Sequence, residues 1–391
     1  MSLLVMILLV FMSHIFPVFA DQTNSGAGIT AIIASDLHFG RDGTISDLIV
    51  PGMAFSEELT DLLITEVIDR HPDVFILTGD NTNSGRAEDM ILLTQKLRKV
   101  SEAGIKIIMT TGNHDFDHSS PEQYEDIYFP LFDISDRDSA SLSYTTVVDD
   151  YVFLAMDDST QDPSRYGLFS RDTLDWICKM CRKYHLKECI FLSHHNVFPG
   201  KDAESSWLNR IRNENLQVVL MENGIRLCFT GHLHSQMILE NDGLSEIISA
   251  MAFGEGHLIG FLEETEDGLR YHAEELDFNK YGYSDLSEML SKKSLEVNRL
   301  LGRSISHIAA EKGLSTEEQE TIVSLFMKFL SWYSTGTIGS HIEEINNNSD
   351  YRKMIDALQD TNYGPWMESV LADNPPDATE LFLPERTTPF F

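Results

Sequence analysis

Polar side chains that could bind a metal ion or move a proton follow five apolar runs of the sequence. One of these sites is Asn113-His114-Asp115, which comes after Gly112 and the apolar residues 105–109. Taken alone it is equally consistent with a simple turn, because Gly-Asn is ordinary turn chemistry. The other four sites have the same arrangement: Asp36 and His38, Asp80, His194 and His195, and His232 and His234.

These five sites are expected to converge. The carboxyl ends of parallel strands meet at one edge of a sheet, and ligands bind there. Carboxylate oxygens, an amide oxygen and imidazole nitrogens suit a pair of divalent metal ions. Asp36 and His38 are two residues apart and share one face of an extended segment, and the same holds for His232 and His234. Three glycines are expected to let the backbone turn sharply beside the ions: Gly79, Gly112 and Gly231.

The apolar runs alternate with helical patterns, which is typical of βαβ units. Strands are predicted at residues 29–35, 74–77 and 105–109, separated by helices at 55–70 and 87–103. A polar, aspartate-rich loop is expected at 116–140, followed by a hairpin of residues 143–148 and 151–156 and a helix at 173–184. Further strands are predicted at 189–192, 227–229, 247–253, 258–262 and 269–276. The pattern predicts an α/β fold with two stacked sheets flanked by helices, a four-layer α/β/β/α arrangement.

The periodicity changes from strand to helix after Tyr283. A helix is predicted at 284–301, and a capping box from Ser315 to Glu318 opens a second long helix. Shorter helices are expected near residues 351–358 and 366–371. The predicted organisation is an α/β domain carrying the site at 27–280, a small all-α domain at 283–375 and a proline-marked, frayed tail at 376–391.

The first twenty residues form a separate segment. Residues 3–12 are unbroken apolar, and Pro17 and Ala20 follow at positions typical of signal-peptidase cleavage. A signal peptide at 1–20 and a secreted or extracytoplasmic protein are therefore expected. Because no Lys or Arg precedes the apolar run, an uncleaved membrane anchor is the alternative, and only then is membrane association expected.

The chain is strongly acidic. Its 391 residues include 62 Asp and Glu against 29 Lys and Arg, so the formal net charge is −33. Such a charge repels phosphate backbones, and no nucleic acid polymer is expected as a partner. It also serves solubility, which is the simpler explanation.

The four cysteines are expected to be buried free thiols. Cys178 and Cys181 fall in a helical pattern, and Cys189 and Cys228 fall in predicted strands. A bridge between Cys189 and Cys228 is the alternative if their strands are neighbours. The spacing does not match a zinc-binding cysteine pattern.

The polar sites resemble, in order and spacing, the signature of the calcineurin-like metallophosphoesterases. The resemblance covers residues 29–276, and residues 79–85 look most like the class III cyclic-nucleotide phosphodiesterase branch, of which several bacterial members carry an appended helical domain. It implies a metallophosphoesterase sandwich as the catalytic domain. The motifs that carry it are Asp36-x-His38, Gly79-Asp80, Gly112-Asn113-His114-Asp115, His194 and Gly231-His232-x-His234.

Transferred position by position, the resemblance implies a role for each site residue. One metal ion would be held by Asp36, His38 and His234, and a second by Asn113, His194 and His232. Asp80 would bridge both ions, and a hydroxide shared by them would attack phosphorus. His114 would be the general acid, and Asp115 would orient His114.

The metals are expected to be divalent. Purple acid phosphatases carry a ferric-iron tyrosine three residues after the bridging aspartate, whereas this chain has Asn83 there. A pair drawn from Mn²⁺, Fe²⁺ or Zn²⁺ is therefore favoured by the mixed nitrogen and oxygen ligands.

The expected substrate is a small phosphoester, in particular a phosphodiester such as a cyclic nucleotide. The alternatives are a phosphomonoester or a phospholipid head-group diester, and a non-catalytic binding protein is disfavoured because no ligand position is missing. Asn83 is a weak candidate for substrate contact, and His195 for substrate contact or support behind the ligands. Surface or loop positions are expected for His118, His257, Asp157 and Asp158. The oligomeric state is left open.

Overall fold

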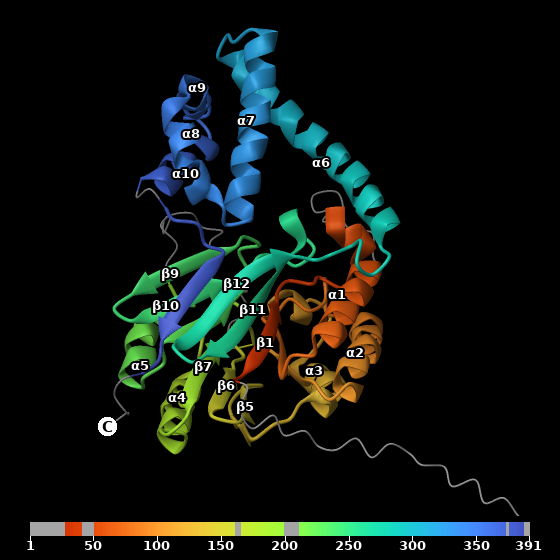
Figure 1. Ribbon diagram of the computed structural model, residues 1–391, viewed down its shortest axis with the longest axis vertical. Coiled ribbons are helices and arrows are strands. Elements are labelled where there is room, and N and C mark those ends of the chain that lie inside the picture. The colour runs from red at the N-terminus through yellow and green to blue at the C-terminus, as the bar shows by residue number, and fades with distance from the viewer. Residues whose placement is uncertain (1–27, 41–50, 161–165, 199–210, 373–374, 387–391) are drawn as a thin grey trace, which may run out of the picture.

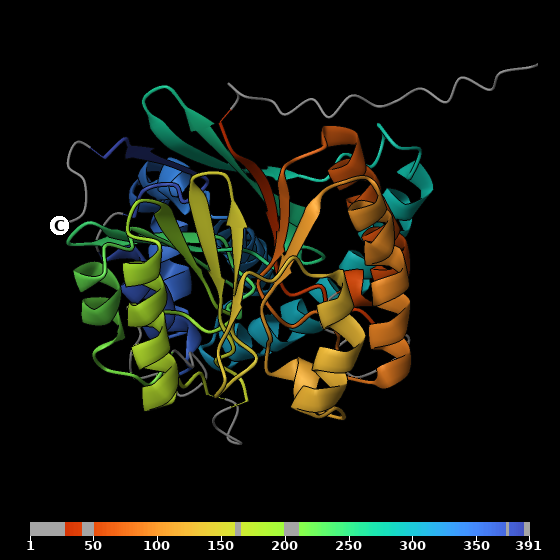
Figure 2. The same cartoon turned by 90° about the horizontal axis from the view of Figure 1, so that it is seen from below.

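Two β-sheets pack face to face, with helices on both outer faces (Figure 2). The computed structural model describes residues 28–40, 51–160, 166–198, 211–372 and 375–386. The central strands are buried on both faces, as the pattern of β2 (Val74–Leu77) illustrates, because a helical layer covers one side and the other sheet covers the second side. The predicted four-layer α/β/β/α arrangement is confirmed.

The first sheet has the strand order β13-β12-β11-β1-β2-β3. Its members are β1 (Thr30–Ala34), β2, β3 (Lys106–Met109), β11 (Leu258–Thr265), β12 (Gly268–Glu275) and β13 (Glu380–Pro384). The strands β1, β2 and β3 are parallel to one another, so their carboxyl ends meet at one edge.

The second sheet has the order β4-β5-β6-β7-β8-β10-β9. Its members are β4 (Asp136–Arg137), β5 (Tyr144–Val148), β6 (Tyr151–Ala155), β7 (Glu188–Leu192), β8 (Leu227–Thr230), β9 (Met237–Asn241) and β10 (Leu244–Ile248). The strands β6, β7, β8 and β10 are parallel, and β5–β6 is the predicted antiparallel hairpin.

Apolar side chains from both sheets form the central core. Ile33, Ile76 and Phe153 are fully buried there, together with Phe229. The helices α1 (Ser56–Arg70), α2 (Ala87–Glu102) and α3 (Pro121–Tyr128) cover the first sheet, and α4 (Arg171–Lys183) and α5 (Leu216–Glu222) cover the second.

The C-terminal helices pack around a core of their own that includes Phe329, Tyr351 and Met354. They are α6 (Ser284–Glu311), α7 (Thr316–Ser334), α8 (Ile342–Asn347), α9 (Ser349–Ala357) and α10 (Tyr363–Leu371), and Figure 1 shows them above one end of the sheets. The capping box of Ser315 and Glu318 starts α7 as predicted. The helix predicted at 284–301 runs ten residues further than expected, and the division into separate domains stays a prediction.

Three predictions about elements were wrong. The loop expected at 116–140 contains α3, which a second capping box of Ser120 and Gln123 opens. The strand expected at 247–253 is β10, which ends at Ile248 because the chain then crosses to the other sheet, where Ala252 N–H donates to the Ser35 carbonyl. The tail expected to be frayed at 376–391 contains β13, which pairs with β12 and so fills the edge of the first sheet.

The cysteines are free thiols, as predicted, and all except the half-buried Cys178 are buried. The alternative bridge does not form, because Cys228 lies opposite Phe191 rather than Cys189 across the β7–β8 pair. The segment predicted as a signal peptide, residues 1–20, lies outside the described residues. Within the described ranges, each helix is too short or too polar to cross a bilayer.

Candidate metal centre

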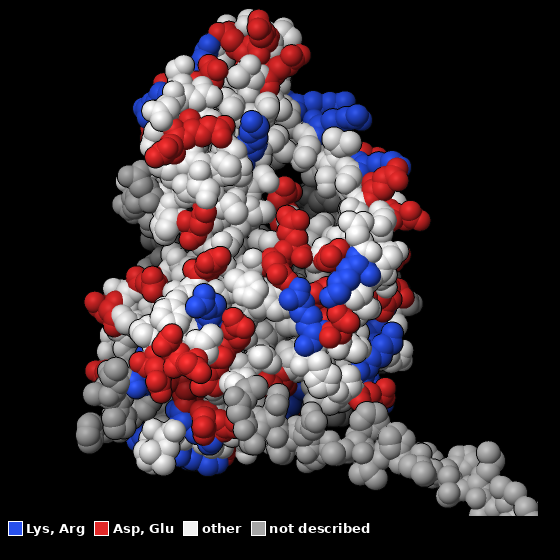
Figure 3. All heavy atoms as spheres, viewed as in Figure 1, with Lys and Arg blue, Asp and Glu red and all other residues white. Residues whose placement is uncertain are grey.

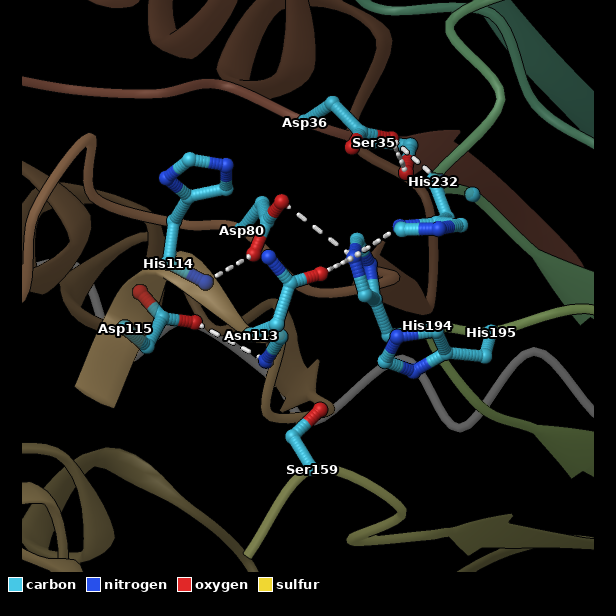
Figure 4. Close-up of polar contacts among 12 residues, drawn as sticks. Ser35, Asp36, Asp80, Asn113, His114, Asp115, Ser159, His194, His195 and His232 are labelled. Carbon is cyan, nitrogen blue, oxygen red and sulfur yellow. Dashed lines mark hydrogen bonds and ion pairs between the residues drawn. The ribbon is translucent and has the colours of Figure 1, made fainter. Parts of the chain in front are cut away.

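All five polar sites lie at the same end of the two sheets, where the parallel strands end. Three of them follow β1, β2 and β3 in the first sheet, and two follow β7 and β8 in the second. Figure 4 shows their side chains pointing toward one another across the junction between the sheets. The convergence expected from the sequence is therefore present, and it joins both sheets rather than one.

The backbone is bent at five of the seven predicted metal ligands. These non-glycine residues have left-handed φ values: Asp36 (51°), His38 (42°), Asp80 (46°), His232 (69°) and His234 (54°). Such conformations are uncommon for residues with a Cβ atom and persist where the surrounding structure enforces them, often at functional sites. At this site, these conformations direct the listed side chains into one shared space.

The first ligand group is built around Asp36, which is fully buried. Its Oδ2 accepts hydrogen bonds from the Ser35 hydroxyl and from the His232 backbone N–H at 3.0 Å. Its Oδ1 is buried without a hydrogen-bond partner and lies 3.3 Å from His234 Nε2. His38 Nε2 lies 3.1 Å from that same nitrogen. A carboxylate oxygen and two imidazole nitrogens thus share a space in which a cation would satisfy all three.

The second group is built around His194, which is also fully buried. Its Nε2 lies 3.2 Å from Asp80 Oδ2, 3.2 Å from Asn113 Oδ1 and 3.3 Å from His232 Nδ1. Asp80 Oδ2 is also 3.7 Å from His38 Nε2 of the first group. The Asp80 carboxylate therefore lies between two ligand groups, as a bridging ligand would, and the residues fit a pair of divalent ions.

Two glycines are required here for close approach and one for its φ value. A Cβ atom on Gly231 would lie 2.0 Å from Ser35 Oγ, and one on Gly112 would lie 2.0 Å from the Asp80 backbone nitrogen. A sharp backbone turn was expected at all three glycines. Of the three, only Gly79 has a left-handed backbone conformation, with φ +87°. At the other two sites the missing side chain allows neighbouring loops to touch.

The pKa values of the four histidines in the two groups are shifted in opposite directions, two downward and two upward. Burial lowers the pKa of His38 to about 3 and holds the pKa of His232 well below its usual value. Burial also acts against charge at His194, but the Asp80 carboxylate outweighs it and raises the pKa to about 10. A carboxylate likewise raises the pKa of His234 above its usual value. In the second group, His232 is therefore a neutral imidazole, whereas His194 must lose a proton to bind a metal.

Metal binding to the metal-free protein is accordingly expected to release a proton at pH 7. The Asp80 carboxylate raises the pKa of His194 to about 10, so this ring must lose a proton before it can bind a metal, and apparent affinity should rise with pH. Titration calorimetry with Mn²⁺ in PIPES and in Tris measures this, since the two buffers differ in ionisation enthalpy. Equal heats in both would contradict it.

His114 lies at the exposed side of the metal groups, with its side chain 33% accessible. Its backbone N–H donates to Asp80 Oδ1 at 2.8 Å. Its Nδ1 lies 3.1 Å from the Asn83 carbonyl oxygen and 3.5 Å from Asp117 Oδ2, and the ring is 4.9 Å from that of His38. The carbonyl contact fixes the proton on Nδ1 when the ring is neutral and leaves Nε2 to meet a substrate.

The Asp115 carboxylate forms its hydrogen bonds with groups other than His114, which differs from the orienting contact expected from the resemblance. Its carboxylate is fully buried and accepts five hydrogen bonds, from backbone and side-chain groups of Asn81 and Thr82 and from the Gly112 N–H. Burial raises the pKa of Asp115 to about 6 against these bonds. Asp115 therefore ties the loop after β3 to the loop after β2, while Asn83 and Asp117 orient the histidine.

His195 supports the site from behind. It is fully buried, and its Nδ1 and backbone N–H contact Asp158 at 3.1 and 2.8 Å. Its ring centroid lies 4.4 Å from that of His232. Asp158 and Asp157 lie in a loop, as expected, but both are buried, and Asp157 accepts a hydrogen bond from Thr111 at 2.9 Å. Both carboxylates are buried because the loop after β6 folds under the metal groups.

His118 is exposed, as expected, and its ring contacts the Ser84 carbonyl at 3.0 Å. His257 was expected in a solvated turn, but its ring packs edge-on against Phe278 with 5.2 Å between centroids. Burial lowers the pKa of His257 to about 4.

Glu246 is a supporting residue that the sequence analysis missed. It is fully buried on β10. Its Oε1 accepts from the Val197 N–H at 2.7 Å and from the Thr230 hydroxyl at 2.8 Å, and its Oε2 accepts from the Phe198 N–H at 2.7 Å. Burial raises the pKa of Glu246 to about 7 against these bonds. The signal was an acidic residue inside an apolar strand, Leu244-Ser245-Glu246-Ile247-Ile248.

Glu246 joins the loop after β7 to the end of β8, and these two segments carry His194 and His232. Glu246→Gln removes one acceptor oxygen and should weaken metal binding and kcat/KM by roughly 10- to 100-fold, as loss of a supporting contact commonly does. Glu240→Gln on the exposed strand β9 is the matched control. Calorimetric metal affinity and steady-state kinetics measure both. If the folded Glu246→Gln protein bound metal with wild-type affinity, the hydrogen bonds of Glu246 would not be needed to hold the two segments in place.

Comparison with known proteins agrees with this geometry. Residues 29–236 match the profile of the calcineurin-like phosphoesterase family. A protein of Psychrobacter arcticus named probable cyclic nucleotide phosphodiesterase is 23% identical over 248 residues, which cover 59% of this chain and 82% of the relative. A protein of Moraxella catarrhalis with the same name is 24% identical over 169 residues, 42% of this chain and 59% of the relative.

Solved structures are also similar. A dimetal phosphatase from Danio rerio superposes with a TM-score of 0.48 at 13% identity, over 63% of this chain and 96% of that chain. A purple acid phosphatase from yellow lupin seeds has a TM-score of 0.46 at 12% identity, over 63% of this chain and 51% of that chain. The matched family segment spans more than half of the chain and includes every predicted metal ligand. The chain therefore belongs to the calcineurin-like phosphoesterase family and is a metal-dependent phosphoester hydrolase.

Proposed function

We propose that the protein is a phosphodiesterase that uses two divalent ions, drawn from Mn²⁺, Fe²⁺ and Zn²⁺, to hydrolyse small phosphodiesters such as cyclic nucleotides. The observation that carries this proposal is the position of Asp80 between two ligand groups, each with a histidine nitrogen within 3.7 Å of the same oxygen. The names of the bacterial relatives support the substrate class.

The side chains divide the work in the following way. When bound, the ions supply positive charge that offsets the phosphate oxygens and lowers the pKa of the attacking water. Asp36, His38 and His234 would hold one ion, and Asn113, His194 and His232 the other, with Asp80 shared. His114 stands beside the pair with Nε2 directed away from its Asn83 contact. We assign to it the proton given to the leaving alkoxide.

The charge of the molecule favours a small substrate over a polymer. Acidic side chains are spread over the face shown in Figure 3, and the whole chain carries −33. A polyanion would be repelled along its length, whereas a single phosphodiester group carries one negative charge that the ions offset. Single-stranded DNA should therefore be cleaved far more slowly than a small diester at physiological salt.

The test is hydrolysis by the full chain reconstituted with Mn²⁺. Bis(4-nitrophenyl) phosphate and a cyclic nucleotide should be hydrolysed, a phosphomonoester more slowly, and His232→Ala should remove the activity. His185→Ala, an exposed histidine after α4, is the control. Undiminished turnover in His232→Ala, or a clear preference for the monoester, would overturn the proposal.

We also propose that the chain is exported, on the basis of the apolar segment at 3–12 and the small residues that follow it. Expression in a bacterial host should yield a product whose N-terminus begins after Ala20. Mass spectrometry of the extracytoplasmic fraction measures this. Full-length protein in the membrane fraction would instead indicate an uncleaved anchor.

A further inference from the structure

Residues 291–300 in the middle of α6 are not part of either core, and Leu301, which follows them, packs partly buried against the C-terminal core. Leu286 and Leu290 at its start are buried against the helical layer of the first sheet, and Ile305 and Ala309 near its end are buried in the C-terminal helical core. Between them, residues 291–301 include no buried side chain, although all are described. Figure 1 shows this stretch as a strut between the sheets and α7. It therefore crosses open space with side chains available to a ligand.

The end of α7 is hydrogen-bonded to the loop that carries His234. The Ser334 carbonyl accepts from the Gln236 N–H at 2.9 Å, two residues after the metal ligand His234. The Ser331 hydroxyl donates to Glu255 Oε1 at 2.8 Å, which ties the helix to the loop after β10. These contacts hold α7 beside the ligand loop and place its inner face toward the metal side.

A cavity of about 500 Å³ lies between the two helices and the metal centre. His234 lines it from the metal side, and Met251 lines it from the neighbouring loop. Figure 3 shows the surface hollowed beside α6. The helices contribute aliphatic side chains, namely Val297, Leu300 and Leu301 from α6 and Met327 and Leu330 from α7, together with small polar side chains.

The lining follows the helical repeat. On α6, Ser294, Val297 and Leu301 are spaced by three and four residues, so they lie on one face. On α7, Met327 and Leu330 begin a stripe with the same spacing. Each helix therefore presents aliphatic side chains to the cavity, with serines beside them. Part of this apolar surface is open to solvent, since Leu300 remains 55% exposed. Apolar surface left open beside a catalytic centre is typical of a ligand site.

We propose that this cavity binds an alkyl chain, so that the preferred substrate is a phosphodiester with one long-chain alkyl ester group. This inference rests on the proposed diesterase function and adds a substrate class to it. With the phosphate at the metal ligands, an ester group directed past His234 enters the space between α6 and α7. Each methylene removed from water there contributes about 0.8 kcal/mol, which corresponds to roughly fourfold in affinity.

The chemistry of the walls favours an alkyl chain over a nucleoside. Bases are recognised by stacking on aromatic rings and by hydrogen bonds to their edges. Among the described lining residues, His234 carries the only ring, and it is assigned to the metal. The Ser331 hydroxyl is already engaged by Glu255, whose carboxylate would repel any further phosphate group. An uncharged aliphatic chain meets none of these penalties.

The experiment uses a series of alkyl 4-nitrophenyl phosphates with methyl, butyl and octyl groups, hydrolysed by the full chain with Mn²⁺. The leaving group is constant, so the chemical step is matched across the series. We expect kcat/KM to rise by about two- to fourfold per methylene until the cavity is filled. Leu300→Gln should lower the octyl-to-methyl ratio by roughly fivefold or more. Leu295→Gln is the matched control, because Leu295 is equally exposed on α6 (57%) but does not line the cavity.

Binding provides a second measurement. Octylphosphonate should bind more tightly than methylphosphonate by calorimetry, and Leu300→Gln should reduce that difference. The inference would be overturned if kcat/KM did not change along the alkyl series and the two phosphonates bound equally tightly. It would also be overturned if Leu300→Gln lowered kcat/KM for a cyclic nucleotide but left the octyl-to-methyl ratio unchanged. If no diester is hydrolysed but the octyl preference in binding is present and depends on Leu300, the proposed function fails and the cavity assignment stands.

Discussion

Asp80→Asn is expected to lower kcat/KM for a phosphodiester by roughly a thousandfold or more. The substitution removes the negative charge that lies between the two ligand groups, 3.2 Å from His194 Nε2 and 3.7 Å from His38 Nε2. Charge stabilisation by bound metals is worth several kcal/mol, and each 1.36 kcal/mol is tenfold in rate. Metal content after dialysis measures the loss of metal binding, and steady-state kinetics measures the loss of turnover.

Asp80→Asn removes the negative charge of the side chain but keeps its shape. Asparagine tolerates the left-handed φ of 46° at position 80 and can still accept the His114 N–H through its amide oxygen. Asp149→Asn is the matched control, because Asp149 has the same φ value in an exposed hairpin turn far from the site. A folded Asp80→Asn protein that retains two ions and wild-type turnover would rule out a bridging carboxylate.

His114→Gln is expected to lower kcat by roughly 10²- to 10⁴-fold for a diester with an alkoxide leaving group, the usual range for loss of a general acid. The same substitution should cost far less for a 4-nitrophenyl diester, because nitrophenolate leaves as a stable anion and needs little help from a proton donor. The contrast between the two substrates is the measurement, since a purely structural role would slow both equally.

His118→Ala is the control for this prediction. It removes a histidine four residues further along, whose ring is exposed and contacts only backbone, the Ser84 carbonyl. Asp117→Asn should give a smaller loss with the same leaving-group dependence, because Asp117 Oδ2 lies 3.5 Å from His114 Nδ1 and helps to orient the ring. Equal losses for both leaving groups in His114→Gln would transfer the acid role to another group.

The ligand set followed from local pattern. Each metal-binding side chain stands at the end of an apolar run, and runs that alternate with helices form parallel strands whose ends meet. The residues at 36, 80, 113, 194 and 232 could therefore be grouped before any coordinates were known. Their types decided the chemistry, because carboxylates and imidazoles at a shared edge bind cations. The matched family segment, residues 29–236, includes all of these residues.

What the sequence left undetermined concerns contacts between segments far apart in the chain. Asp115 and Asp158 stand at loop positions like those of the ligands, yet one binds the loop after β2 and the other binds His195. Glu246 interrupts an apolar strand, and only the tertiary structure shows the three donors that surround it.

In the C-terminal segments, too, local sequence pattern predicts where elements begin but not which distant residues they contact. Capping and periodicity determined that α7 begins after Ser315, but not that its far end binds the loop of His234. Nor did local pattern indicate that β13 completes a sheet or that the middle of α6 faces a cavity. The sequence predicted the metal ligands and most of the helices and strands that carry them, because these depend on neighbours along the chain. The tertiary structure alone decided which carboxylates are buried and what adjoins the metals, because burial depends on residues that meet only after the sheets and helices have packed.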